Sequence, residues 1–427
     1  MSSALLLVVL VAVAYVAAKL AFQWIGRHLL IVSGAEYLLL GILLGPQVSG
    51  LMTPQALRTF IPFMTLALGW MGAMVGMRLY LPGMVRLRGV FYRLAFVQSL
   101  TTLVVVSGAS LLVLQWLFGV TAGYALMPAL VLGAIGTSSA SDAVQLIVER
   151  LGRRSVVVRQ IEVAVTMDSL IAIGTLTMVF CLNHVGTPQL ARAPTAVEWF
   201  VISCAVGVTG GALFHLFLGE ERHPDRLFIS LAGAIIFVTG AASFLQLSPL
   251  LPGLLMGAIL ANTSRNRQQI EAVLHSVERP LYFVLLLCGG ALWSPGGSGA
   301  WFIPVLVFLV VRMLSKVYVS RLAARFNDMT GVLGPNWGRA LIGQGGLALA
   351  IAFNYLIESN SYFPDIIFTA AVVSVLLTDL ASARLMQKVV TTSPYEVRAS
   401  GEQQRPVIGE ANAAEPEPEP APAGGEG

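Results

Sequence analysis

The sequence predicts an all-α protein that crosses a membrane about thirteen times. Of its 427 residues, 56% are hydrophobic and only 11% are charged, whereas soluble domains carry about 25% charged residues. Apolar windows of the length that a bilayer requires, about 20 residues, recur along the whole chain, and the mean hydropathy is +0.79. This composition excludes a water-soluble globular protein, a disordered chain, a disulfide scaffold and a basic nucleic-acid-binding protein.

Thirteen apolar windows, separated by Pro, Gly and charge clusters, account for most of the chain. The first has Lys19 inside its end and no basic residue ahead of it, which favours a retained helix over a cleaved signal peptide. The windows cover about residues 3–22, 31–50, 59–77, 90–116, 122–150, 155–180, 196–217, 226–243, 247–262, 270–292, 301–325, 335–357 and 363–388.

Basic residues alternate across the connections between these windows. The odd-numbered connections together with the C-terminal tail hold 21 Lys and Arg, whereas the even-numbered connections hold only Arg58 and Arg192. Because basic loops stay on the cytoplasmic side, we expect the N-terminus outside and the C-terminus in the cytoplasm.

The last part of the chain differs from the apolar body. Seven Glu and two Arg give residues 389–427 a net charge of −5, against +9 for residues 1–388. We expect residues 391–427 to form a disordered, Pro- and Glu-rich cytoplasmic tail, because such a composition cannot bury a core. Isolated cysteines and the lack of a nucleotide-binding Gly-rich motif predict no metal cluster, no cofactor and no enzymatic activity.

Six ionisable residues fall inside the predicted spans. Each costs at least about 2.5–3.5 kcal/mol to insert at mid-bilayer, so each indicates a function by default. At about 1.5 Å per residue, all six lie between the midplane and the cytoplasmic side, and their formal charges sum to −2, which suits a cation or protons. They are Asp142, Glu162, Asp168, Arg312, Lys316 and Asp379.

Asp168 carries the strongest functional indication of the six. It lies at the centre of its span, and its sequence neighbours (VAVTMDSLIAI) include no base. The others have simpler alternatives: Asp142 lining a vestibule, Glu162 pairing structurally with Arg312 or Arg159, and Asp379 lying near the cytoplasmic end of its span.

Two predicted helices are interrupted at matching places. AIGTSSASDAV (134–144) places Gly136, Thr137, Ser138 and Ser139 at the midplane, and ALIGQGGLALA (340–350) places Gln344, Gly345 and Gly346 there. Paired interruptions of this kind indicate a transporter binding site, although small residues can also simply allow close helix packing. The interruptions lie seven spans apart, an odd number, which predicts two six-helix repeats that are inverted across the membrane.

Several motifs resemble the monovalent cation:proton antiporters, especially bacterial sodium/proton antiporters and potassium efflux transporters. LLLGILLGPQVSGL (38–51) and ALGWMGAMVGMRL (67–79) are similar to the family's second and third helices. SSASDAVQLIVERLG (138–152) and TMDSLIAI (166–173) resemble its ion-site segment. LLPGLLMGAILANT (250–263), RMLSKVYVSRLAARF (312–326) and GQGGLALA (343–350) resemble later motifs, so that the resemblance covers about residues 1–390.

This resemblance implies the sodium/proton antiporter fold over residues 1–390. A core part (about 90–180 and 301–388) would move against a dimerisation part, mainly helices 1–3 and 8–10, in a homodimer. It implies elevator-type exchange of Na⁺, K⁺ or Li⁺ for protons in a bacterial inner membrane, serving pH homeostasis, with the lipid bilayer and the ions as partners and no nucleic acid.

The resemblance also assigns roles to particular residues. Asp168 matches the aspartate that binds the cation and the proton, with Thr137, Ser138 and Ser139 in the unwound segment beside it. Lys316 or Arg312 matches the basic residue of the eleventh helix. Glu162, Asp142 and Asp379 would be supporting charges.

Two positions depart from the family pattern. Met167 stands where Asp, Asn or Gln is usual, and a thioether is a poor ligand for a hard cation; Leu347 stands where the potassium-efflux branch often has an acid. A single midplane carboxylate favours electroneutral exchange. Two alternatives stay open, a sodium-coupled organic anion transporter of the same architecture and a non-transporting homologue that acts as a membrane partner.

Overall fold

The computed structural model describes residues 35–85, 89–151, 155–184, 194–218, 224–294, 299–357 and 362–396, and every regular element in them is helical. The helices are α2 (Ala35–Leu44), α3 (Pro54–Met77), α4 (Leu81–Val85), α5 (Gly89–Phe118), α6 (Ala122–Thr137), α7 (Ser141–Leu151), α8 (Val156–Asn183), α9 (Ala196–Leu218), α10 (Pro224–Phe244), α11 (Leu250–Thr263), α12 (Arg267–Leu292), α13 (Phe302–Phe326), α14 (Thr330–Leu333), η2 (Trp337–Leu341), α15 (Gly345–Leu356) and α16 (Pro364–Thr391).

Within these residues, seven helices are long and apolar enough to cross a membrane, or eight if the two parts of α16, bent by 53°, form one span. Each predicted window after the first coincides with helix in the structure. The predicted total of about thirteen spans is not confirmed. The window at 3–22 lies outside the described residues, and α2, α6, α11 and α15 are only 10, 16, 14 and 12 residues long.

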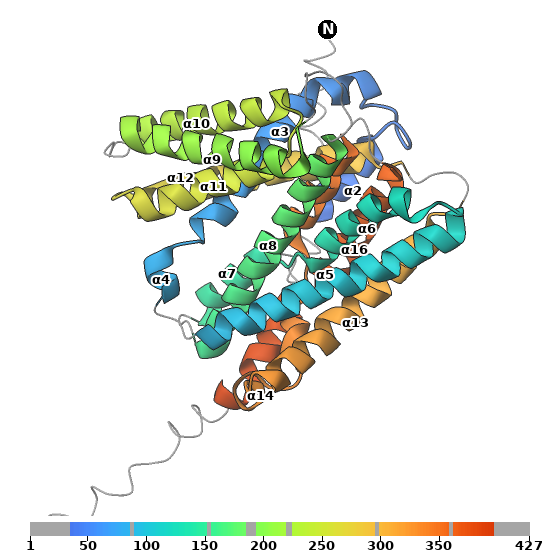
Figure 1. The fold of residues 1–427 in the computed structure, drawn as a ribbon, viewed down its shortest axis with the longest axis vertical. Coiled ribbons are helices and arrows are strands. Elements are labelled where there is room, and N and C mark those ends of the chain that lie inside the picture. Colours follow the sequence, from blue (N-terminus) through green and yellow to red (C-terminus); the bar gives the residue numbers. More distant parts are fainter. Residues whose placement is uncertain are drawn as a thin grey trace, which may run out of the picture.

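The helices pack as two groups (Figure 1). One group contains α3 with α9, α10, α11 and α12, and α2 packs along α12. The other contains α5, α6, α8 and α13, together with η2, α15 and α16. Helix α8 lies between the groups, because it packs closely on α5 and α6 and also contacts α9 and α11.

Glycines bring α3 and α11 into direct backbone contact. A Cβ added to Gly72 or Gly76 of α3, or to Gly253 or Gly257 of α11, would lie 2.0–2.3 Å from a carbonyl oxygen of the opposite helix. The i, i+4 spacing of both pairs is the small-residue pattern that allows close helix approach in membranes. The glycines of the sequence motifs 67–79 and 250–263 therefore serve packing.

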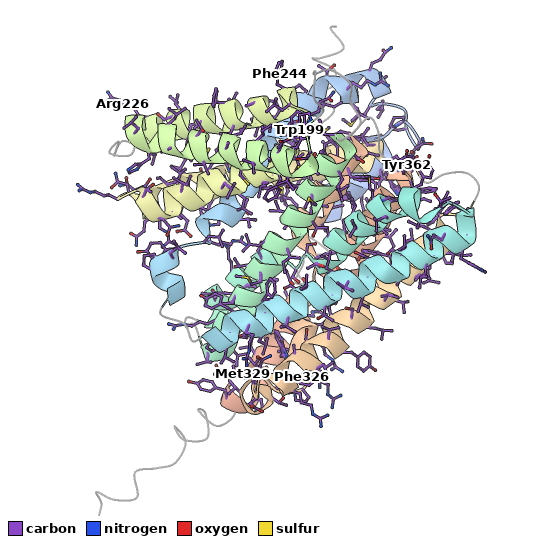
Figure 2. The ribbon with its side chains drawn as sticks, viewed as in Figure 1. Trp199, Arg226, Phe244, Phe326, Met329 and Tyr362 are labelled. Atoms are coloured by element: carbon purple, nitrogen blue, oxygen red, sulfur yellow. The ribbon has the colours of Figure 1, made fainter. Side chains whose placement is uncertain are left out.

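Large apolar side chains cover the outside of the molecule. Figure 2 shows Phe244 at the end of α10 and Phe326 at the end of α13, which are 88% and 74% exposed. An apolar exterior of this kind fits a lipid environment, since lipid tails do not penalise exposed hydrocarbon.

The C-terminal boundary differs from the prediction. Helix α16 continues to Thr391, and the next residues stay on the body: Ser393 is buried, its hydroxyl accepts from the amide of Glu396, and the Pro394 ring packs close to Gly334. Residues 391–396, which the prediction assigned to the tail, thus lie on the folded body, because this turn packs against the end of α14. The remainder, residues 397–427, lies outside the described residues.

Candidate functional site: a buried aspartate at two crossing helix breaks

The two predicted helix interruptions lie against each other. Residues 138–140 separate α6 from α7, and residues 342–344 separate η2 from α15. The backbone amide of Ala140 in the first break donates a 2.8 Å hydrogen bond to the carbonyl of Gly343 in the second. The structure has a break in helix at both places, and a five-residue 3₁₀ helix, rather than a long half-helix, precedes the second.

The small residues predicted at the breaks allow this crossing. Gly345 has φ +66°, a left-handed conformation that favours glycine, and a Cβ there would lie 3.0 Å from the Cα of Ala140. Gly136 and Gly346 instead make room for other helices, since a Cβ there would lie 2.9 Å from Val106 of α5 or 2.2 Å from Tyr282 of α12. The Gln344 side-chain amide donates a 2.7 Å hydrogen bond to a carbonyl of α6, which joins the second break to the first helix.

Asp168 lies beside this crossing, in the middle of α8, with no solvent exposure. Its Oδ1 accepts a 2.5 Å hydrogen bond from the Ser99 hydroxyl of α5. Its Oδ2 accepts from the Ser139 hydroxyl at 2.6 Å and from the Lys316 ammonium at 2.7 Å. Four segments, α5, α8, α13 and the first break, thus converge on one carboxylate.

Lys316 is the charged partner of Asp168. It projects from α13, is also fully buried, and forms a salt bridge with Oδ2 of Asp168. Its ammonium further donates to the carbonyl of Thr137 at 2.6 Å and to the hydroxyl of Ser139 at 3.0 Å. The base that Asp168 lacks among its sequence neighbours is therefore supplied from α13.

Arg312, one turn before Lys316, has a different role. Its guanidinium donates to the carbonyl of Ile342 at 2.7 Å and to the carbonyl of Ser138 at 3.3 Å. The last carbonyls of a helix lack partners inside that helix, so a forked cation suits this position. Arg312 bridges the two breaks and holds their carbonyls together.

The hydroxyls of residues 137–139 have two kinds of hydrogen-bond acceptor. Thr137 and Ser138 donate back to carbonyls within the last turns of α6, at 2.9 and 2.8 Å. Ser139 donates to Asp168 and has a second acceptor, the carbonyl of Leu341, at 3.2 Å. Thr137 and Ser138 thus contribute their carbonyls to the site, and Ser139 contributes its hydroxyl.

The other predicted charges are Glu162, Asp142 and Asp379. Glu162 is half-buried and lies six residues before Asp168 on α8, about 9 Å along the helix. Asp142 lies in the first turn of α7 and Asp379 at the bend of α16, and their side chains lie outside what the structure describes. Asp168, Lys316 and Arg312 are thus the three of the six predicted charges whose contacts at the two breaks the structure describes.

The site forms a polar layer between two apolar clusters. One cluster contains Ile135 of α6 and Ala172 of α8, and the other contains Ala143 of α7 and Val165 of α8. Met167 is half-buried and packs against the second cluster. Its thioether is therefore part of an apolar contact.

None of the sequence motifs includes Ser99. The available signal is a polar island, QSLTT at residues 98–102, in the middle of the apolar helix α5. Two contacts fix the register of α5 against α8, one from Gln160 to the carbonyl of Phe91 and one from Ser99 to Asp168, and both join residues that are 69 apart. This constant offset places the polar island beside the carboxylate.

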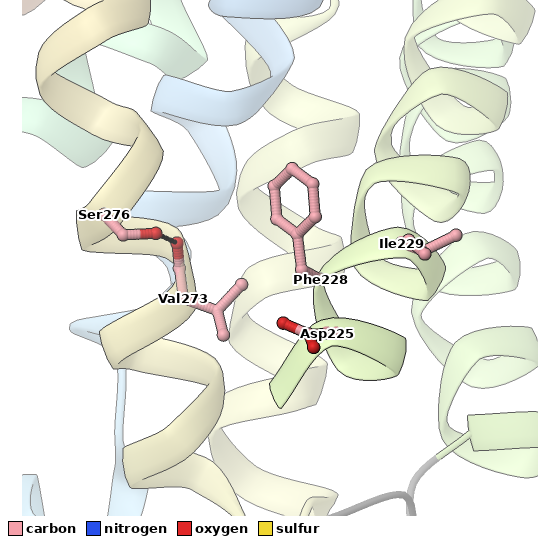
Figure 3. Close-up of a pocket in the computed structure, with 5 residues that line it drawn as sticks. All are labelled: Asp225, Phe228, Ile229, Val273 and Ser276. Atoms are coloured by element: carbon pink, nitrogen blue, oxygen red, sulfur yellow. Dashed lines mark hydrogen bonds between the residues drawn. The ribbon is translucent and has the colours of Figure 1, made fainter. Parts of the chain in front are cut away.

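A separate pocket of about 420 Å³ lies between α10 and α12 (Figure 3). It is lined by Asp225, Phe228, Ile229, Val273 and Ser276. These residues are distinct from the Asp168 cluster, so the pocket is not part of the candidate site.

Comparison with solved structures identifies the fold. The chain matches a structure of the sodium proton antiporter MjNhaP1 from Methanocaldococcus jannaschii at pH 8 with a TM-score of 0.66 and 15% sequence identity, over 90% of this chain and 97% of that chain. It matches an electron-microscopy map of the same antiporter with a TM-score of 0.63 and 15% identity, over 94% and 99%. Neither a family model nor a curated protein matches the sequence.

The chain is therefore an all-helical integral membrane protein with several apolar spans. Its fold is that of the sodium proton antiporter MjNhaP1, and the resemblance predicted from the motifs is confirmed at the level of the fold.

Proposed function

We propose that the protein is a secondary active transporter that exchanges a monovalent cation, Na⁺ or K⁺, for protons, and that Asp168 binds the two in turn. The observation that carries this proposal is a completely buried carboxylate at the crossing of two helix breaks, paired with Lys316. A buried carboxylate requires a compensating positive charge. A cation, a proton or the Lys316 ammonium supplies it.

The surroundings of Asp168 suit a hard monovalent cation. The carboxylate, the Ser139 hydroxyl and the carbonyls of Thr137 and Ser138 are oxygen ligands, the type that such ions prefer. In the described structure the Lys316 ammonium occupies Oδ2 and the Thr137 carbonyl, so an arriving cation displaces it. Release of one proton for each bound cation, from the Asp168 carboxyl or from the Lys316 ammonium, leaves the charge of the site unchanged, which favours electroneutral exchange driven by the membrane proton gradient.

We propose an elevator-type cycle for the movement of this site. Residues 90–180 and 301–388 would form the moving core, and helices 1–3 and 8–10 of the expected span order would form the dimerisation part of a homodimer. Support comes from the two packing groups of Figure 1 and from the similarity to an antiporter fold. The inverted repeats, an outside N-terminus, a cytoplasmic C-terminus, a bacterial inner membrane and a role in pH homeostasis belong to the same proposal.

The test is cation-dependent proton flux in proteoliposomes, scanned over Na⁺, K⁺ and Li⁺. Asp168→Asn should abolish the flux while the protein still folds, with reduced stability because the Lys316 ammonium is left buried without its partner. Asp365→Asn makes the same chemical change at an exposed aspartate of α16 and should retain it. Flux at the parental rate in Asp168→Asn contradicts the site. Solute uptake with sodium and without proton coupling favours the organic anion alternative.

A further inference from the structure

We propose that Ser99 of α5 is a cation ligand of the transport site and that Gln98 positions its hydroxyl. This inference rests on the proposed function and adds residues from a helix that none of the sequence motifs includes. Ser99 and Asp168 are both fully buried, and the Ser99 oxygen lies 2.5 Å from Oδ1. Ser139 and Lys316 occupy Oδ2. Ser99 therefore binds Oδ1, the carboxylate oxygen that Ser139 and Lys316 do not contact in these hydrogen bonds.

Each of the two serines has an alternative acceptor for its proton. A hydroxyl carries one proton and two lone pairs, so it binds a cation only if that proton points elsewhere. The Ser139 hydroxyl has the carbonyl of Leu341 at 3.2 Å, and the Ser99 hydroxyl has Oε1 of Gln98 at 3.4 Å. Rotation of both protons toward these acceptors leaves a lone pair on each serine oxygen free to bind, together with the carboxylate, a common ion.

The Gln98 side chain is held in the orientation that this rotation requires. Its Nε2 donates to the hydroxyl of Thr102 at 3.4 Å, and that hydroxyl donates to the backbone carbonyl of Gln98 at 2.8 Å. With the amide nitrogen engaged on one side, Oε1 faces Ser99. Both Gln98 and Thr102 are fully buried, so water does not compete for these groups.

The composition of α8 explains why a ligand from α5 is needed. The residue before Asp168 is Met167, which packs on an apolar cluster. In the described part of the chain, no three His, Cys, Asp or Glu side chains are grouped as a metal site would need. Once the cation has displaced Lys316, the single carboxylate, with neutral oxygens from Ser99, Ser139 and the backbone, balances one positive charge, which matches a monovalent rather than a divalent ion.

The experiment compares Ser99→Ala with Ser99→Thr, which keeps the hydroxyl, and with Ser107→Ala as the control. Ser107 is a buried serine on the same helix, eight residues from Ser99, whose hydroxyl lies next to Gly133. We expect Ser99→Ala to raise the apparent KM for the cation about tenfold, the size of one lost interaction with a charged group, with kcat little changed. Ser99→Thr should recover most of the affinity, and Ser107→Ala should match the parent.

A second readout separates this inference from the proposed function. Thermal stabilisation of the detergent-solubilised protein by Na⁺, K⁺ or Li⁺ reports binding without transport. Ser99→Ala should raise the cation concentration for half-maximal stabilisation about tenfold. Gln98→Met, which removes the acceptor for the serine proton, should shift it in the same direction by a smaller factor.

Each combination of results decides one question. A parent that transports, with Ser99→Ala at unchanged KM and unchanged stabilisation, overturns the inference and leaves the proposed function standing. A parent that is stabilised by cations but moves no protons overturns the proposed function, while loss of that stabilisation in Ser99→Ala still supports the inference. A parent with neither property overturns both.

Discussion

The ammonium of Lys316 lies 2.7 Å from Oδ2 of Asp168, and neither side chain is exposed. The two residues are 148 positions apart in the sequence. Removing one partner of a buried ion pair leaves an uncompensated charge, whereas removing both leaves none. The stability of the fold therefore depends on whether Asp168 has a positive charge beside it.

Lys316→Met should destabilise the protein by about 3–5 kcal/mol, because it leaves the Asp168 carboxylate buried without its cation. The double variant Asp168→Asn with Lys316→Met should recover a large part of that loss. Unfolding in detergent, followed by far-UV circular dichroism, measures both. A double variant no more stable than Lys316→Met would show that the two residues are not energetically coupled.

Competition between protons and cations should appear in the pH dependence of exchange. If both bind Asp168, lowering the pH raises the apparent KM for the cation, by up to about tenfold per pH unit, and saturating cation restores the same kcat. Proton flux in proteoliposomes over a series of cation concentrations and pH values provides the measurement. An apparent KM that stays constant as the pH falls would place the two ions at different sites.

Arg312→Lys should impair exchange at least about tenfold and lower the unfolding temperature, because a single ammonium cannot reproduce the fork that joins Ile342 to Ser138. Arg321→Lys, an exposed arginine on the same helix, is the matched control and should behave as the parent. Equal stability and flux in both variants would mean that the bridge between the breaks is dispensable.

Gly345→Ala should destabilise the protein by at least about 1–2 kcal/mol, since an L-residue is strained at φ +66° and its Cβ would press on the Ala140 backbone. Gly174→Ala on α8 has nothing within 4 Å of the added Cβ and should be neutral or stabilising by up to about 1 kcal/mol. Thermal unfolding of the purified variants distinguishes them. Equal midpoints would contradict the role of Gly345 in the crossing.

Met167→Leu should leave cation-dependent proton flux within about twofold of the parent. The thioether packs against apolar side chains, and replacing Met by Leu nearly conserves the side-chain volume. Apparent KM values for Na⁺, K⁺ and Li⁺ are the relevant measurement. A large rise for one of these ions would instead identify Met167 as part of the binding site.

The positions of the helices and the two breaks were predictable because they depend on local composition. Apolar windows fix the helices, and the Gly- and Ser-rich stretches at 136–141 and 343–346 fix the interruptions. The number of spans was harder to predict from the sequence. Helices α6, α11 and α15 are shorter than a bilayer requires, and hydropathy alone does not show where such helices end.

The partners of Asp168 were less predictable because they come from distant helices. Hydropathy gives the depth of Lys316 and Arg312 but does not show which of them reaches the carboxylate and which the backbone. The Thr137 and Ser138 hydroxyls turn back onto α6 because carbonyls near a helix end accept local hydroxyls. Ser99 is one of several serines and threonines in the apolar helix α5. Only the packing of α5 on α8 places it beside Asp168.

The two contacts between α5 and α8 join residues that are 69 apart in the sequence, and this constant offset restricts insertions and deletions in both helices. Phe91 and Ser99 on one helix are as far apart as Gln160 and Asp168 on the other. One inserted residue between either pair would turn the following side chains by about 100° and move Ser99 out of reach of Asp168, with no change in hydropathy. The segments 91–99 and 160–168 therefore tolerate substitution more readily than any change of length.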